Sequence, residues 1–302
     1  RTGYFNLING YKTPFICDKD RNGDHIYIKN TSVDHIYEVK RFDDRLRSFI
    51  LRYITQVEEE VRTLTGYKFD ECNERGATTW YDTNAYSDKT SLQERMNAIS
   101  SAYSELSRSR LDYVKFYMKN HEQIPTWIMI KVINFSTFIN VLDCSKTDVT
   151  HSLCNLYRMY DKNSKPNVKL LIGSLQWLRI VRNSCAHNER IYCISRSRQE
   201  NSKNPGRILE TYFRMLPQTY TKMTDQKIVD LIIYFKYYLS NKEFGRFIDT
   251  LYNMLTDLQQ KLHPNAFDYI RGHMGIRNVD DLIMLKNFPK EKIDYNKFDK
   301  KV

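Results

Sequence analysis

Apolar residues recur at helical spacing along most of the chain. Between Val33 and Gly66 they return every three or four positions while charged residues occupy the other face. This pattern predicts one long amphipathic helix that ends near Gly66. A very apolar run follows Pro125 and extends to Phe135. Because proline suits the first turn of a helix, this run predicts a buried helix that begins at Pro125.

Further segments carry the same periodicity. The stretch from Ser91 to Met118 predicts one or two helices, and an apolar stripe from Leu170 to Cys185 predicts another. Apolar residues at 228–239 and 244–255 predict two more helices, with a short last helix at 280–285. Strand patterns are weak throughout, and only 7 prolines interrupt the 302 residues. The sequence therefore predicts an all-α fold.

Domain boundaries are not marked by any internal repeat or low-complexity segment. The most polar and basic stretch follows Ser195, and it reads as a loop. We therefore expect residues 1–195 to form one helical domain and residues 196–302 to form a C-terminal helical extension packed on the same core.

The charge balance favours a polyanionic partner. Lys and Arg number 47 against 36 Asp and Glu, so the formal net charge is +11. A positive field of this kind attracts nucleic acids, although a basic surface without a specific partner is the alternative. The candidate phosphate contacts away from the motif described below are arginines of the first long helix and of the loop after Ser195, namely Arg45, Arg47, Arg52, Arg196 and Arg198.

The six cysteines are scattered, with no C-x-x-C pair and no metal-binding cluster. This arrangement predicts reduced thiols and neither a bound metal nor a cofactor. No apolar run has the length of a membrane span, and the first residues do not resemble a signal peptide. We expect a cytoplasmic protein without membrane contacts.

The strongest candidate chemistry is the run from Arg182 to His187, at the end of the apolar stripe. On a continuing helix, Asn183, His187 and Arg190 would share one face, with Arg182 beside them. A guanidinium keeps its charge and an imidazole exchanges protons near neutral pH, so the pair suits phosphodiester cleavage. The structural alternative is a salt bridge from Arg182 and helix capping by Asn183 and His187.

This spacing resembles the active-site motif of HEPN ribonucleases, an arginine followed after four to six residues by a histidine. The wider sequence resembles the bacterial abortive-infection (Abi-like) family. The resemblance is carried by the runs Gly3–Lys12, Phe42–Arg47, Pro125–Met129 and Arg182–Arg190, and it extends to about Tyr192.

The resemblance implies a HEPN-like helical bundle with additional C-terminal helices. It also implies a homodimer in which two motif helices build one composite active site, and a bacterial toxin that cuts RNA and is restrained by a small structured RNA. His187 would act as general base or acid, Arg182 would neutralise the transition state, and Asn183 would orient the histidine or a phosphate oxygen. Arg190 and Asn188 would contact neighbouring phosphates.

Two other functions stay open on the sequence alone. The same cleft could hold a folded RNA without cutting it, as a non-catalytic HEPN-type RNA-binding protein. Alternatively, the chain could be a helical scaffold for protein contacts, with its positive charge incidental.

Overall fold

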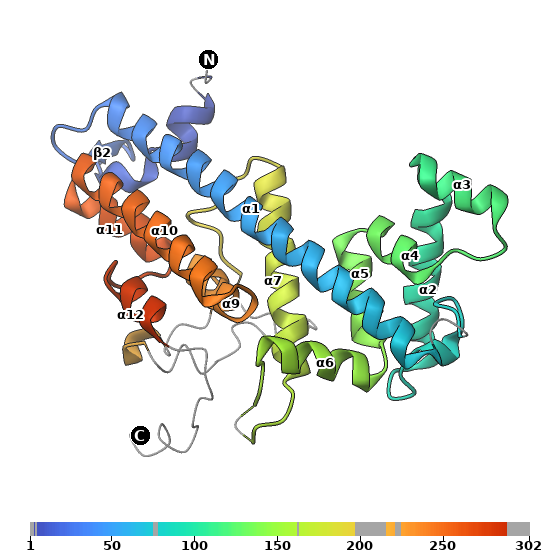
Figure 1. The fold of residues 1–302 in the computed structure, drawn as a ribbon. Coiled ribbons are helices and arrows are strands. Elements are labelled where there is room, and N and C mark those ends of the chain that lie inside the picture. The colour runs from blue at the N-terminus through green and yellow to red at the C-terminus, as the bar shows by residue number, and fades with distance from the viewer. Residues whose placement is uncertain are drawn as a thin grey trace. The chain divides into compact units, whose positions relative to one another are not determined.

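The computed structural model describes residues 3, 5–74, 78–161, 163–196, 216–220 and 225–288, and nearly all of their regular structure is helical (Figure 1). The predicted all-α class is confirmed. The chain forms two units: the described residues of 1–53 and 180–302 form unit 1, and those of 54–179 form unit 2. Two helices, α1 (Val33–Cys72) and α7 (Val168–Ala186), each contribute residues to both units.

Unit 1 begins with short elements. They are the π-helical turn η1 (Phe5–Asn9), the 3₁₀ turn η2 (Thr13–Phe15) and an antiparallel hairpin of β1 (Ile16–Lys19) and β2 (His25–Tyr27). The helical elements of the unit are then the first part of α1 (Val33–Cys72), the end of α7 (Val168–Ala186), η5 (Gln218–Tyr220), α9 (Ile228–Tyr238), α10 (Asn241–Lys261), α11 (Pro264–His273) and α12 (Asp281–Asn287).

Unit 2 contains the rest of α1 and the first part of α7. Between them lie η4 (Thr83–Ala85), α2 (Leu92–Ser107), α3 (Asp112–Asn120), α4 (Thr126–Val132), α5 (Phe135–Cys144) and α6 (Thr147–Tyr157). The segment predicted as one or two helices is two, α2 and α3. The segment after Pro125 also divides: Asn134 accepts a hydrogen bond from the Thr137 amide and so caps α5, which ends α4 at Val132.

The predicted end of α1 at Gly66 is wrong, because the helix continues to Cys72. Gly66 is buried, and a Cβ at this position would lie 3.5 Å from Ile130 Cδ1 on α4. Gly66 therefore faces α4 from within α1, and a Cβ there would make only an ordinary van der Waals contact. Arg62 strengthens the same contact, since it pairs with Glu58 at 2.7 Å and donates to the Ile130 carbonyl at 2.6 Å.

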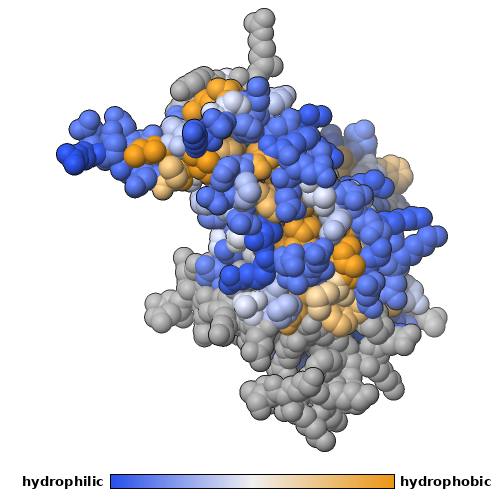
Figure 2. Space-filling view, turned by 90° about the vertical axis from the view of Figure 1, so that its left-hand side faces the viewer, coloured by the Kyte–Doolittle hydropathy of each residue, from blue (hydrophilic) through white to orange (hydrophobic). Residues whose placement is uncertain are grey.

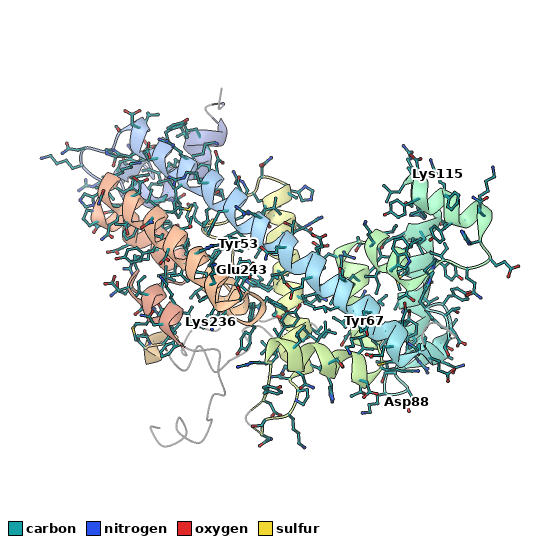
Figure 3. All side chains as sticks on the ribbon, viewed as in Figure 1. Tyr53, Tyr67, Asp88, Lys115, Lys236 and Glu243 are labelled. Carbon is teal, nitrogen blue, oxygen red and sulfur yellow. The ribbon has the colours of Figure 1, made fainter. Side chains whose placement is uncertain are left out.

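The core of unit 1 is aromatic. Phe247 of α10 stacks on Phe49 of α1 at a centroid distance of 5.0 Å and meets Phe235 of α9 edge-on at 5.1 Å. Lys236 of α9 is buried, and its ammonium donates to the carbonyls of Leu285 (2.8 Å) and Phe288 (2.5 Å) at the end of α12 (Figure 3). On the face shown in Figure 2, hydrophilic residues predominate and apolar residues form separated patches.

A buried carboxylate joins three segments of unit 1. Asp43 of α1 is fully buried, and its Oδ1 accepts from the amides of Ile191 (3.1 Å) and Tyr192 (2.9 Å). Its Oδ2 accepts from the Tyr11 hydroxyl at 3.0 Å and from Arg47 at 3.1 Å. Burial raises the pKa of Asp43, and the hydrogen bond from the Tyr192 amide and the charge of Arg47 act in the opposite direction. The four donors therefore offset part of the cost of burying the charge.

We expect Asp43→Ala to lower the free energy of unfolding by about 3 kcal/mol or more, because it removes the buried one of the two carboxylates that pair with Arg47 and leaves two buried backbone amides without an acceptor. Urea denaturation followed by circular dichroism measures this loss. Asp44 is the matched control, since it also pairs with Arg47 but is partly exposed. Asp44→Ala should cost about 1 kcal/mol or less, and equal losses for the two variants would contradict the assigned role of Asp43.

Candidate functional site

The candidate site lies at the C-terminal end of α7. Its predicted apolar stripe is buried, with Leu171, Leu178 and Val181 fully covered. The helix ends at Ala186 because Asn188 adopts a left-handed conformation, with φ +55°. The Asn188 amide bonds to the Cys185 carbonyl (3.2 Å) and the Glu189 amide to the Ser184 carbonyl (2.9 Å). This Schellman-type ending fixes the backbone on both sides of His187.

His187 is exposed at this helix end and lines a groove of about 1100 Å³. No side chain of the described residues hydrogen-bonds to its ring. The groove belongs to unit 1, and its walls come from the chain after α7, from the N-terminal segment and from α1. The side chains or backbone of Asn188, Glu189, Arg190, Gly10, Tyr11, Lys40, Asp44 and Arg47 are among those that line it.

Basic residues outnumber acidic ones in this groove. Arg190 donates to the Gly10 carbonyl at 2.5 Å, which ties the chain after α7 to the N-terminal segment. Lys40 pairs with Asp44, and Arg47 donates to the Glu189 carbonyl at 2.8 Å. The cations are therefore held in place by hydrogen bonds around an exposed imidazole. Such a groove suits an anionic ligand that exchanges a proton with the histidine.

Arg182 and Asn183 are half-buried and are not among the residues that line the groove. The Arg182 guanidinium donates to Asn183 Oδ1 at 3.3 Å. Five residues on an α-helix correspond to a rotation of about 140° between Arg182 and His187. Arg182 therefore does not line the groove that contains His187 of the same chain.

The prediction that a continuing helix carries Arg190 is wrong. It placed Arg190 on the face of Asn183 and His187, but α7 ends at Ala186 and Asn188 turns the chain. Arg190 nevertheless lines the groove, because its bond to Gly10 holds it there. Asn188 also lines the groove, as a left-handed residue next to His187.

The arginines predicted as phosphate contacts away from the motif have different surroundings. Arg47 is buried and paired with Asp43, and it also lines the groove. Arg45 is exposed and lies 3.5 Å from Asp257. Arg52 is exposed on α1, and Arg196 is half-buried with its backbone paired to Gln226. Arg198 lies outside the described residues.

Sequence reasoning missed Lys40, Asp43 and the N-terminal wall of the groove. Tyr11 and Asp43 fall in two of the runs that carry the family resemblance, yet nothing in their spacing shows that they meet. Their contact joins positions 32 residues apart, and the contact of Asp43 with Tyr192 joins positions 149 apart.

Within the described ranges, no group of His, Cys, Asp and Glu side chains could hold a metal ion. All six cysteines are free thiols, as predicted, and burial raises the pKa of Cys185 beside the motif to about 12. Among the helices that the structure describes, none is both long and apolar enough to span a bilayer.

A sequence model described as "Abi-like protein" matches residues 1–193. The matched region contains α1 to α7 and ends beside the last residues that line the groove. Comparisons with curated proteins and with solved structures found no significant match. The family match covers more than half of the chain and indicates an abortive-infection function. The chain therefore belongs to the Abi-like protein family.

Proposed function

We propose that this chain is a metal-independent endoribonuclease of a bacterial abortive-infection or toxin–antitoxin system. It acts as a homodimer of HEPN type and is held inactive by a small structured RNA. The observation that carries the proposal is the exposed His187, fixed at the end of α7 in a groove with three cationic side chains. The net charge of +11 supports RNA as both substrate and inhibitor.

In the proposed reaction, the ribose 2′-oxygen attacks the adjacent phosphorus and the bond to the 5′-oxygen breaks. His187 accepts the proton from the 2′-hydroxyl or donates one to the leaving 5′-oxygen. The products are a 2′,3′-cyclic phosphate and a 5′-hydroxyl. The nucleophile belongs to the substrate, so the reaction requires no metal to generate it and spares DNA.

The arginine stabilises the charge that develops on the phosphorane. Since Arg182 does not line the groove that contains His187, and ideal helix geometry separates the two positions by about 140°, we propose that the groove of one protomer receives Arg182 from the second. Asn183, bonded to Arg182, orients the guanidinium. Arg190, Asn188 and Lys40 contact phosphates on either side of the scissile bond, because they line the same groove as His187.

We expect His187→Ala to slow the cleavage of single-stranded RNA by about 100-fold or more, because it removes the group that transfers the proton. The assay is a single-turnover reaction in EDTA, with the cyclic-phosphate ends identified by mass spectrometry. His25→Ala is the matched control, since His25 is also exposed in unit 1 but lies on β2. RNA binding without cleavage by the unmutated chain would instead support the RNA-binding function, and the absence of both would leave the scaffold function.

The composite site makes a separate prediction. We expect Arg182→Ala and His187→Ala to be inactive alone but to regain activity, up to about a quarter of the wild-type value, when equal amounts are unfolded and refolded together. Half of the dimers are then mixed, and each mixed dimer has one of its two Arg182/His187 pairs intact. An inactive mixture, in which mass spectrometry detects the mixed dimer, would show that both residues act within one chain.

A further inference from the structure

Exposed aromatic rings gather at α3 and the start of α4 in unit 2. Phe116 is 57% exposed and Trp127 is 49% exposed. Tyr117 lies between the two, because its ring is edge-on to Phe116 and to Trp127, each at 5.9 Å, and stacks on His121 at 4.6 Å. Large apolar side chains that are exposed together, rather than singly, mark interaction surfaces.

The surroundings of these rings are basic. Lys115 and Lys119 are exposed at positions i and i+4 of α3, and Figure 3 shows Lys115 projecting from that helix. Lys131 of α4 is exposed, with its ammonium 5.7 Å from the Tyr113 ring. From position 108 to 131, the basic side chains outnumber the acidic ones; they are Arg108, Arg110, Lys115, Lys119 and Lys131, against Asp112 and Glu122.

We propose that the surface formed by Lys115, Phe116, Lys119, Trp127 and Lys131, the α3–α4 surface, binds single-stranded RNA. Unpaired bases stack on Phe116 and Trp127, and the lysines contact the phosphates between them. The inference rests on the proposed function only in taking RNA as the partner. It adds a second RNA-binding surface, in unit 2, to the catalytic groove proposed in unit 1.

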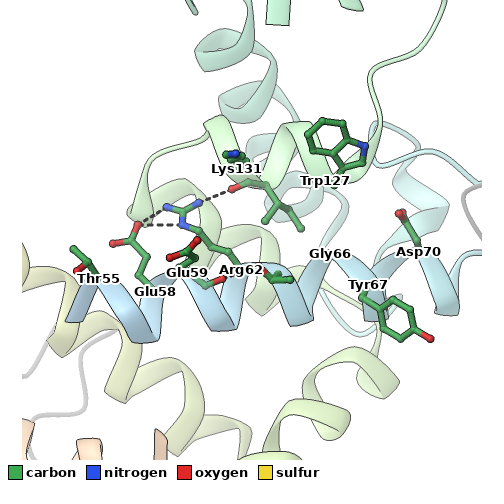
Figure 4. Close-up of a pocket in the computed structure, with 11 residues that line it drawn as sticks. Thr55, Glu58, Glu59, Arg62, Gly66, Tyr67, Asp70, Trp127 and Lys131 are labelled. Atoms are coloured by element: carbon green, nitrogen blue, oxygen red, sulfur yellow. Dashed lines mark hydrogen bonds and ion pairs between the residues drawn. The ribbon is translucent and has the colours of Figure 1, made fainter. Parts of the chain in front are cut away.

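The groove beside Trp127 favours RNA over an anionic membrane. This groove of about 690 Å³ lies between α1 and α4, and Figure 4 shows Trp127 and Asp70 at one end of it and Glu59 farther along α1. Carboxylates there repel a continuous anionic surface such as a bilayer. They accept hydrogen bonds from the N–H groups of a base stacked on Trp127, while the phosphates run along the lysines of α3.

Tryptophan fluorescence tests the proposal directly. Trp80 and Trp177 are buried, so quenching by an added oligonucleotide reports on Trp127. The titration uses the full chain with His187→Ala, so that the probe, a single-stranded RNA of about 12 nucleotides, is not cleaved. We expect quenching by this RNA and much weaker quenching by the matching duplex, because paired bases do not stack on a protein ring.

Charge-reversal variants distinguish RNA binding at the α3–α4 surface from a general attraction of RNA to lysines. Lys115→Glu/Lys119→Glu should weaken binding on the order of 10-fold and reduce the slope of log affinity against log salt by about 1.4, the value for two lost phosphate contacts. Lys165→Glu/Lys169→Glu is the matched control, since both lysines are exposed in unit 2 away from α3; it should retain the affinity and slope of the parent. Phe116→Ala should weaken binding about 5-fold or more.

Three results would overturn the inference: equal weakening by the two double variants, equal binding of single strands and duplex, or quenching by anionic lipid vesicles without quenching by RNA. The test is independent of catalysis. If the unmutated chain fails to cut RNA but the His187→Ala chain shows the expected quenching, the nuclease proposal fails and the α3–α4 surface stands. If cleavage depends on His187 but the quenching is absent, the nuclease proposal stands and the proposed RNA binding by the α3–α4 surface fails.

Discussion

The hydrogen bonds to the Asp43 carboxylate are the interaction on which the candidate site depends. A buried charge is costly, and it is tolerated here because four donors surround it. Two of these donors are backbone amides just after the motif helix, and a third is the hydroxyl of Tyr11 in the N-terminal segment. The carboxylate thereby sets where two walls of the groove lie relative to α1. An apolar residue of the same size could not accept these bonds, so the two carboxylate oxygens connect α1 with the N-terminal segment and with the chain after α7.

The end of α7 adds a second constraint. A helix that continued past Ala186 would carry Glu189 and Arg190 along its own axis, away from the N-terminal segment. The left-handed Asn188 instead turns the chain, so that Arg190 reaches Gly10 and Glu189 reaches Arg47. His187 therefore sits on a rigid helix end while its neighbours close the groove around it. The same geometry keeps Arg182 on another side of the helix, which is why the proposed chemistry requires a second copy of the chain.

The sequence predicted the elements better than it predicted their contacts. The periodicity at 33–66, 170–185 and 228–255 identified α1, α7, α9 and α10, because burying one face of a helix leaves a direct trace in the pattern. Gly66 was misinterpreted as a stop, since local propensity cannot show that α4 lies against it. The hairpin of β1 and β2 was missed, because its strands have four and three residues and, apart from half-buried Ile16, are exposed, so no alternation is required.

For the site, too, the local pattern could be predicted from the sequence, whereas the contacts between distant segments could not. The motif and the apolar stripe are both local, so the sequence identified His187 and the helix before it, but not that the helix ends at Ala186. The role of Arg47 was not predictable, because its partners lie four residues back on the same helix and 142 residues away, and only the fold decides that the side chain turns inward. For the same reason, the net charge alone does not show which cations are paired with carboxylates. Lys40, Arg47 and Lys261 pair with carboxylates within unit 1, so they can act on a phosphate at close range but add less to the long-range field. Lys115 and Lys119 make no ion pair with the described residues, and such lysines attract a polyanion at long range.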